Sequence, residues 1–124
     1  GDPTFSYEEI RAAVDTAHAL GRRITVHSYG PDAARDALRA GADSIEHAVD
    51  LDDETLEGMA KRGVFYVPTI DHNRYYSDIA PEQKTWPAGV QGAFQQFIAR
   101  NVETARRAHR KGVRLAMGSD AVNS

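Results

Sequence analysis

The sequence contains no cysteine among its 124 residues. Disulfide bonds, cysteine nucleophiles and thiolate zinc sites are therefore excluded, whereas the redox state of the surroundings stays open. The sequence also lacks any apolar run near the roughly 20 residues that a membrane-spanning helix needs, and no secretory signal pattern opens it. We therefore expect no contact with a membrane and take a cytoplasmic location as the default.

The sequence has no marked excess of charge of either sign. Its 15 Lys and Arg residues stand against 18 Asp and Glu, which gives a formal net charge of −3. This balance offers no electrostatic basis for binding nucleic acid. Hydrophobic residues at 41% and charged residues at 27% are ordinary for a soluble domain. We expect residues 1–124 to form one domain with a hydrophobic core of its own.

One short pattern occurs four times along the chain. A helix ends at a glycine, a strand follows, and a polar residue stands at or just beyond the far end of the strand. The four copies are Gly21–His27, Gly41–His47, Gly63–Thr69 and Gly112–Asp120. The predicted strands are Ile24–Tyr29, Ser44–Ala48, Val64–Ile70 and Arg114–Gly118.

Helical segments alternate with these strands. A capping box, Ser6 to Glu9, opens the first helix, Pro31 opens the second, and a long helix runs from about Val90 to Lys111. The alternation predicts an α/β fold with a parallel sheet and right-handed crossovers. Four such units make half of a (β/α)₈ barrel, which typically has ~250 residues. A short doubly wound sheet is the alternative, but no Gly-rich phosphate loop follows a strand.

The helical periodicity also predicts which residues are buried. The first helix should bury Ile10, Ala13, Val14, Ala17 and Leu20. The last helix should bury Phe94, Phe97, Ile98, Val102, Ala105 and Ala108. Residues 71–89 show no clear periodicity, and we expect them to form an irregular loop at the carboxyl ends of the strands, called the rim below.

Three residues at the rim have the chemistry of metal ligands. Side chains alternate along a strand, so His27 should face the barrel interior with Thr25, and His47 should share a face with Ile45. By the same rule Glu46 should point towards the helices. Two imidazoles and the carboxylate of Asp120 suit a divalent metal, most plausibly zinc. Asp120 could then move a proton from a metal-bound water. The alternative, a hydrogen-bonded core role for each histidine, explains the repeated spacing less well.

Other polar and aromatic residues near the rim are weaker candidates. We expect His72, Tyr75 and Tyr76 to contribute to a substrate-binding wall, with Trp86 beside them, because long rim loops often have this role. The alternative is that they cover apolar surface beneath the loop. His18 and His109 lie within predicted helices away from the rim, where surface or packing roles are expected.

The residues around the rim resemble a known family. Ile24-Thr-Val-His27-Ser-Tyr-Gly30, Asp43-Ser-Ile-Glu-His47, Val67-Pro-Thr69 and Gly118-Ser-Asp120 are similar to the second half of an amidohydrolase-superfamily barrel. The imidazolonepropionase-like and Xaa-Pro dipeptidase (prolidase)-like branch is the most similar. The resemblance covers nearly the whole chain, from the fourth helix of that barrel to its eighth strand.

The resemblance implies roles for three residues. His27 and His47 would end strands 5 and 6 and bind metal, and Asp120 would end strand 8 as both ligand and general acid/base. Members of the family hydrolyse amide bonds in dipeptides, N-acyl amino acids and cyclic amides, usually with one or two zinc ions. The parent protein would thus be a metal-dependent hydrolase of a small amide or dipeptide substrate.

The sequence also departs from the family pattern. It has no His-x-His pair, which the family carries on strand 1, and no counterpart of the carboxylated lysine of strand 4. Tyr29 stands where close relatives often carry a second histidine. We therefore expect the chain to be inactive alone, to need the missing N-terminal half-barrel as a partner, and to form homo-oligomers through its unpaired strand edges. The alternative is a non-catalytic module or truncated product that acts only through association.

Overall fold

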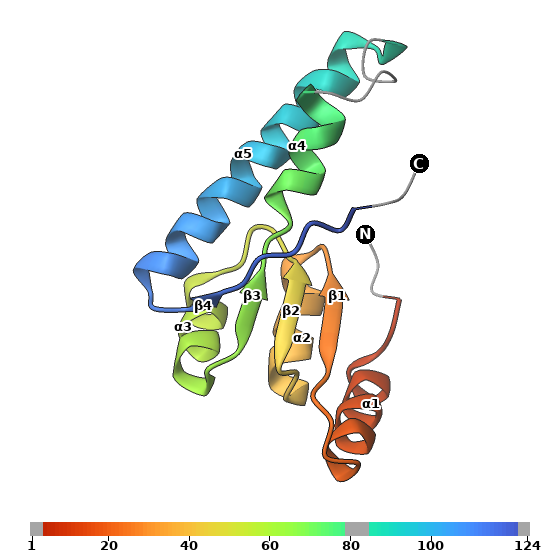
Figure 1. Cartoon of the computed structure of the whole chain (residues 1–124), viewed down its shortest axis with the longest axis vertical. Helices are drawn as coiled ribbons and strands as arrows, with labels where there is room; N and C mark the ends of the chain where they lie inside the picture. Colours follow the sequence, from red (N-terminus) through yellow and green to blue (C-terminus); the bar gives the residue numbers. More distant parts are fainter. Residues whose placement is uncertain (1–3, 79–84, 122–124) are drawn as a thin grey trace.

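Four parallel strands and five helices make up the structure, a computed structural model that describes residues 4–78 and 85–121 (Figure 1). In chain order the elements are α1 (Tyr7–Ala19), β1 (Thr25–Ser28), α2 (Pro31–Ala40), β2 (Ser44–His47), α3 (Asp53–Arg62), β3 (Phe65–Val67), α4 (Ile70–Asp78), α5 (Ala88–Arg110) and β4 (Arg114–Leu115). The strands lie in the order β1-β2-β3-β4. The prediction of a parallel (β/α)₄ unit is confirmed.

One face of the sheet is buried against the helices. Ile45 and Tyr66 lie opposite each other on β2 and β3 and are both fully buried. They belong to a cluster with residues of three helices, α2, α3 and α5. These include Ala34, Ala37, Leu38, Leu56, Met59, Ala105 and Ala108. This face holds the hydrophobic core, as the resemblance to part of a barrel implies.

The opposite face of the sheet is open. Thr25 and His27 on β1 are exposed, and Glu46 and Phe65 are only half-buried. A hollow of about 590 Å³ lies on this side near the amino ends of the strands and is bordered by Arg23, Arg62 and Arg114, among others. The sheet is therefore covered on one side only.

All four strands are shorter than predicted, β3 and β4 the most, and part of the predicted loop is helical. β3 ends at Val67, and β4 has only two residues. Within the predicted loop 71–89, α4 occupies residues 70–78 and α5 begins at Ala88, while residues 79–84 lie outside the described part. The buried residues of α4 are the polar Asn73 and Ser77. The sequence therefore has no apolar residues at helical spacing from which this helix could be predicted. Asn73 donates a hydrogen bond to Asn101 of α5 instead, over 3.2 Å.

The capping box at the start of α1 is confirmed, but its predicted buried face is not. The Glu9 amide donates to the Ser6 hydroxyl over 3.2 Å. Of the five apolar residues expected inside, only Val14 is buried, and Leu20 is 72% exposed. These residues are exposed because α1 lies at the β1 edge of the sheet and packs on α2 (Figure 1).

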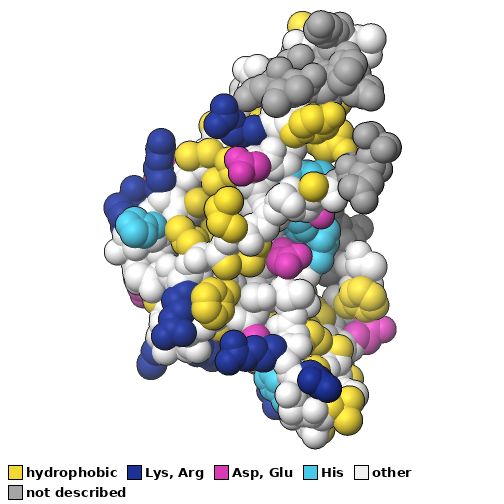
Figure 2. All heavy atoms as spheres, in the orientation of Figure 1, with side chains coloured by type: hydrophobic (Ala, Val, Ile, Leu, Met, Phe, Trp, Pro, Cys, Tyr) yellow, Lys and Arg dark blue, Asp and Glu magenta, His cyan; other side chains and the backbone are white. Residues whose placement is uncertain are grey.

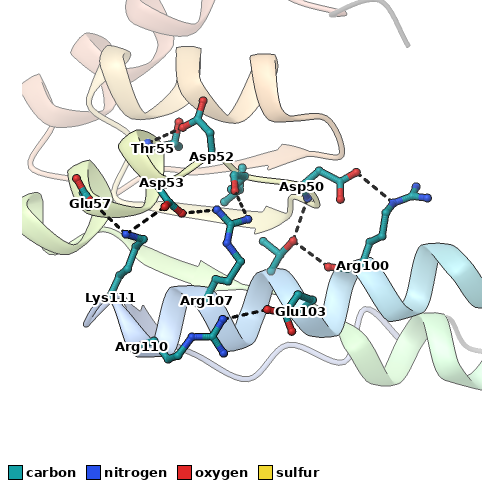
Figure 3. A network of polar contacts seen from close by, with 12 residues as sticks. Asp50, Asp52, Asp53, Thr55, Glu57, Arg100, Glu103, Arg107, Arg110 and Lys111 are labelled. Atoms are coloured by element: carbon teal, nitrogen blue, oxygen red, sulfur yellow. Dashed lines mark hydrogen bonds and ion pairs between the residues drawn. The ribbon is translucent and has the colours of Figure 1, made fainter.

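Polar contacts attach α5 to α3 and to the segment that follows β2 (Figure 3). The Arg107 guanidinium donates to the carbonyl of Leu51 over 2.8 Å and also pairs with Asp53. The Thr104 hydroxyl accepts from the Asp50 amide over 3.0 Å. Exposed ion pairs contribute little each, so the half-buried bonds to the backbone matter more for placing this segment.

No helix within the described ranges is both long enough and apolar enough to cross a membrane.

The start of α3 provides a test of the fold. The Asp52 carboxylate accepts from the Thr55 amide over 2.7 Å and pairs with Arg35. We expect Asp52→Ala to lower the free energy of unfolding by about 1 kcal/mol, the usual cost of losing a helix cap. Asp32→Ala, which also removes a partner of Arg35 but no cap, should cost less than about 0.5 kcal/mol in the same urea titration.

The effect of Asp52 should depend on pH. The Thr55 hydrogen bond lowers the pKa of Asp52 below its ordinary value, and Arg35 acts in the same direction. A lowered folded-state pKa means that the stabilisation is present above the unfolded-state pKa of about 4 and is lost as the pH falls through the folded-state pKa. The difference between Asp52→Ala and the unaltered chain should therefore shrink below about pH 4. A pH-independent difference would contradict this origin.

Candidate functional site

The two histidines predicted as metal ligands lie side by side at the rim. Their ring centroids are 4.1 Å apart, at an interplanar angle of 68°. Backbone pairing between the segments of β1 and β2 continues past the end of β2. The Ala48 amide donates to the carbonyl of Ser28 over 2.6 Å, and the Val49 amide donates to the carbonyl of Tyr29 over 3.1 Å. This extension holds the ends of β1 and β2 together and brings His27 and His47 into contact.

The side chain of His47 reaches this position through an unusual backbone conformation. His27 lies opposite Glu46 in the register, so Glu46 shares the open face with His27 and does not point towards the helices as predicted. Ile45 belongs to the buried face, and simple alternation from Ile45 would take His47 there too. Instead, His47 has a φ of 68°, in the left-handed region. The turn of the backbone re-aims the imidazole, which ends beside His27.

Two neighbouring groups fix the strained position of His47. The Tyr66 hydroxyl is buried in the core and donates to the carbonyl of Ala48 over 2.5 Å. The Nδ1 atom of His47 lies 2.7 Å from the hydroxyl of Thr69, which is itself buried and has a φ of 48°. Contact with Thr69 occupies Nδ1 and leaves Nε2 for another partner. Metal-binding histidines are commonly oriented in this way by a bond to the second ring nitrogen.

Electrostatics favour the neutral form of His47. Burial lowers the pKa of this imidazole, and the neighbouring His27 adds to the effect. The carboxylates of Asp120 and Glu46 act in the opposite direction. A neutral imidazole is the form that binds a metal.

Tyr29 forms part of the same cluster. Its ring stacks on His47 with centroids 4.8 Å apart at an angle of 15°, and it meets His27 edge-on at 4.9 Å. Burial raises the pKa of the Tyr29 phenol, and the negative charge of Asp120 adds to the rise. Because the pKa is raised above its ordinary value, the phenol is neutral at neutral pH.

Asp120 lies at the rim beyond β4, with a φ of 46°. Its carboxylate is 3.6 Å from Nε2 of His72, which α4 carries in its first turn. The His72 ring in turn contacts Tyr76 edge-on at 5.1 Å. The structure thus brings His72 to Asp120, a contact that the sequence pattern did not predict.

The remaining candidates for a substrate wall lie on or near the helical pair of α4 and α5. Tyr75 contacts Tyr76 edge-on at 5.4 Å and is 47% exposed. Trp86 packs on Phe94 of α5 with centroids 5.5 Å apart. Of this group, only Tyr76 is linked to the rim, through His72. The assignment of these residues to substrate binding stays a prediction.

The donor chemistry at the rim fits a divalent metal, although the full set of ligands does not converge. Within residues 4–78 and 85–121, no three His, Asp or Glu side chains lie close enough together to hold a metal ion. His27 and His47 form a pair, and Asp120 is close enough to influence His47 electrostatically. Two imidazoles and one carboxylate are a donor set typical of zinc.

The sequence pattern does not predict the roles of three residues that shape the site. In the sequence pattern Thr69 is only a polar strand end, Tyr29 only a departure from the family, and Gly118 only part of the Gly118-Ser-Asp120 motif. Their importance arises from contacts between neighbouring strands. The positive φ values at His47, Thr69 and Asp120 have no sequence signal of the kind that glycine gives.

Gly118 provides a test of how Asp120 is placed. A Cβ atom on Gly118 would lie 2.5 Å from Cγ1 of Val67, closer than real contacts allow. We expect Gly118→Ala to lower the free energy of unfolding by about 1–3 kcal/mol, as overpacking does, because the β-branched Val67 has little freedom to move. Gly92→Ala is the control, since nothing lies within 4 Å of that position. An unchanged denaturation midpoint for Gly118→Ala would contradict the close packing of β3 and β4.

Known proteins resemble the chain over almost its entire length. The Amidohydrolase family model matches residues 1–124. An uncharacterised protein of Mycobacterium tuberculosis is 34% identical over 119 residues, which cover 96% of this chain and 32% of the relative. Ochratoxinase of Aspergillus niger is 27% identical over 119 residues, covering 94% of this chain and 24% of the enzyme.

Solved structures show the same likeness in three dimensions. A Xaa-Pro dipeptidase with bound methionine superimposes with a TM-score of 0.81 at 33% identity, over 97% of this chain and 30% of its own. The crystal structure of A. niger ochratoxinase gives a TM-score of 0.84 at 27% identity, over 94% of this chain and 26% of its own. A prolidase complexed with N-methylphosphonate-L-proline gives 0.80 at 26% identity, over 96% of this chain and 29% of its own.

The chain thus spans about a third or less of the length of the relatives it matches. In this structure His27 lies in β1 and His47 ends β2, whereas Asp120 lies beyond the end of β4; their roles stay predictions. The family match over the whole chain confirms the resemblance, and the chain belongs to the amidohydrolase family, in its prolidase-like branch.

Proposed function

We propose that this chain contributes the histidine pair and the acid/base group of a metal-dependent site that hydrolyses amide or peptide bonds. The substrate class is a small amide, such as a dipeptide, an N-acyl amino acid or a cyclic amide. The names of the structural relatives, a Xaa-Pro dipeptidase and a prolidase complexed with N-methylphosphonate-L-proline, favour the dipeptide. The chain covers less than a third of these enzymes, so the proposal concerns the whole protein.

The observation that carries the proposal is the contact between His27 and His47. Two imidazoles with centroids 4.1 Å apart, one of them buried and bonded through Nδ1 to Thr69, are arranged as metal ligands usually are. His18 illustrates the contrast, because it pairs with Asp43 over 2.9 Å at the opposite end of the sheet. A role in metal binding accounts for the strained backbone at His47, whereas a packing role does not.

Asp120 is the group that we assign to proton transfer. Its side chain is partly open to solvent, so it can both reach a water at the rim and exchange protons. Nε2 of His72 lies 3.6 Å from the carboxylate, and the Tyr29 phenol lies within electrostatic reach of it. When bound, a divalent metal such as zinc lowers the pKa of a coordinated water towards about 7 and polarises a carbonyl group. Asp120 would be the group that accepts a proton at the rim and returns it to the leaving nitrogen.

Metal content provides the first test. After zinc loading and desalting, we expect the chain to retain about one zinc per molecule, as measured by mass spectrometry. His27→Ala and His47→Ala should each abolish retention, because each removes one of the paired imidazoles. His109→Ala, at an exposed position of α5, is the matched control and should retain the metal.

Two variants at Thr69 separate the orientation of the His47 imidazole from the coordination of the metal. Thr69→Val removes the hydroxyl that contacts Nδ1 of His47 without touching a ligand, and should weaken zinc binding by about 10–100-fold. Thr69→Ser keeps the hydroxyl and should restore most of the affinity. Retention of zinc in His27→Ala or His47→Ala, or no retention by the unaltered chain, would contradict the assignment of the ligands.

Catalytic activity of the chain by itself is the second test. We expect no enzyme-like hydrolysis of a panel of dipeptides and N-acyl amino acids after zinc loading, because at most three of the five or six ligands of the family are present. Release of amino acid above the rate of a metal-only blank would show that three ligands suffice. In that case Asp120→Asn should abolish the activity.

A further inference from the structure

A buried asparagine of α5 lies behind the rim. Asn101 is in the middle of this helix and has no exposed surface. Histidine and acidic side chains lie together on the visible face of the molecule, over the carboxyl ends of β1 and β2 (Figure 2). Asn101 reaches the same end of the sheet from the side that the helices cover. An amide is costly to bury unless it is hydrogen-bonded, so the partners of Asn101 indicate its role.

The Asn101 amide holds the end of β3. Its Nδ2 atom donates to the carbonyl of Pro68 over 3.1 Å, one residue beyond the end of the strand. This carbonyl lies in the same peptide plane as the amide nitrogen of Thr69. Fixing that plane limits the directions in which the Thr69 side chain can point, at a residue whose φ of 48° is itself strained.

Asn73 of α4 completes the contacts around Thr69. Its Nδ2 atom donates to Oδ1 of Asn101 over 3.2 Å, which orients the Asn101 amide group with its nitrogen towards Pro68. The backbone amide of Asn73 donates to the carbonyl of Thr69 over 3.4 Å. The peptide groups on both sides of Thr69 are therefore hydrogen-bonded, one to Asn101 and the other to Asn73.

Asn101 is also linked to the end of β2, through Tyr66. The Tyr66 hydroxyl donates to the carbonyl of Ala48, the residue after His47, over 2.5 Å. Burial raises the pKa of the Tyr66 phenol, and a hydrogen bond from the Asn101 side chain acts in the opposite direction. One amide group thus bonds to the two groups that hold the strained residues His47 and Thr69.

We propose that Asn101 is a positioning residue for the imidazole of His47. It acts through Thr69, whose hydroxyl lies 2.7 Å from Nδ1 of His47. A leucine would fill nearly the same volume in the core, so what the asparagine adds is its hydrogen bonds. The consequence for metal binding rests on the proposed function, whereas the orientation of the imidazole does not.

The ring of His47 provides a test that needs no metal. Proton–nitrogen correlation spectra of the imidazoles report which ring nitrogen carries the proton. We expect Asn101→Leu to move the His47 ring signals towards those of Thr69→Val, because both variants lose the directed contact at Nδ1. Asp43→Ala, which loses its hydrogen bonds at the opposite end of the sheet, is the control and should leave the signals in place. Unchanged signals in Asn101→Leu overturn the proposal.

Zinc affinity shows whether Asn101 acts through Thr69. Asn101→Leu should raise the zinc dissociation constant about tenfold in the otherwise unaltered chain. In the Thr69→Val chain the same substitution should change it by less than about twofold, because the contact with the imidazole is already lost. Equal effects in both chains overturn the proposal. If the unaltered chain retains no zinc, the proposed function is contradicted, and the ring signals of His47 still decide the role of Asn101.

Asn73→Ala is a milder variant that keeps the proposal testable if Asn101→Leu does not fold. It leaves Asn101 and Pro68 in place but removes the donor that orients the Asn101 amide. The far-ultraviolet circular dichroism spectrum shows whether each variant keeps its helices. Asn73→Ala should shift the His47 ring signals in the same direction as Asn101→Leu and by a smaller amount. Unchanged signals in a folded Asn73→Ala chain would also overturn the proposal.

Discussion

The structure depends on one constraint, which is that every crossover between its parallel strands passes over the same face of the sheet. Right-handed connections place α2, α3 and α5 on that side, where they bury Ile45 and Tyr66. The hydrophobic effect therefore acts on one face only. The other face, with His27 and Glu46, stays open. The proposed site at the rim follows from this asymmetry, because the open face gives access to it.

The residues of the proposed site have strained backbone conformations, which contacts with core side chains stabilise. His47 ends β2, Thr69 and Asp120 lie beyond β3 and β4, and all three have positive φ values, which cost energy in residues other than glycine. The buried Tyr66 hydroxyl holds the segment after His47, and Val67 packs against Gly118 ahead of Asp120. Substitutions in the core should therefore shift the residues at the rim, because the same side chains stabilise the sheet and determine where its strands end.

The fold could be predicted well from the sequence because its signals are local. The glycines that end α2 and α3, the capping box of α1 and the alternation of helices with strands each depend on a few neighbouring residues. α4 had no such signal, since its buried residues are the polar Asn73 and Ser77. Asn73 donates a hydrogen bond to Asn101 of α5, a partner that no local pattern reveals. The buried face of α1 was overestimated, because periodicity shows that a helix has an apolar side but not whether anything covers it.

For the site, the sequence by itself determined which groups are available: two histidines and an aspartate, each at or just beyond the end of a strand in a repeated pattern. The tertiary structure decided how they meet. Alternation along β2 would have sent the side chain of His47 to the wrong face, and the left-handed turn at that residue reversed the outcome. Contacts such as those of Thr69 with His47 and His72 with Asp120 join residues from different elements. Their geometry is set by packing between strands and helices, which no local pattern encodes.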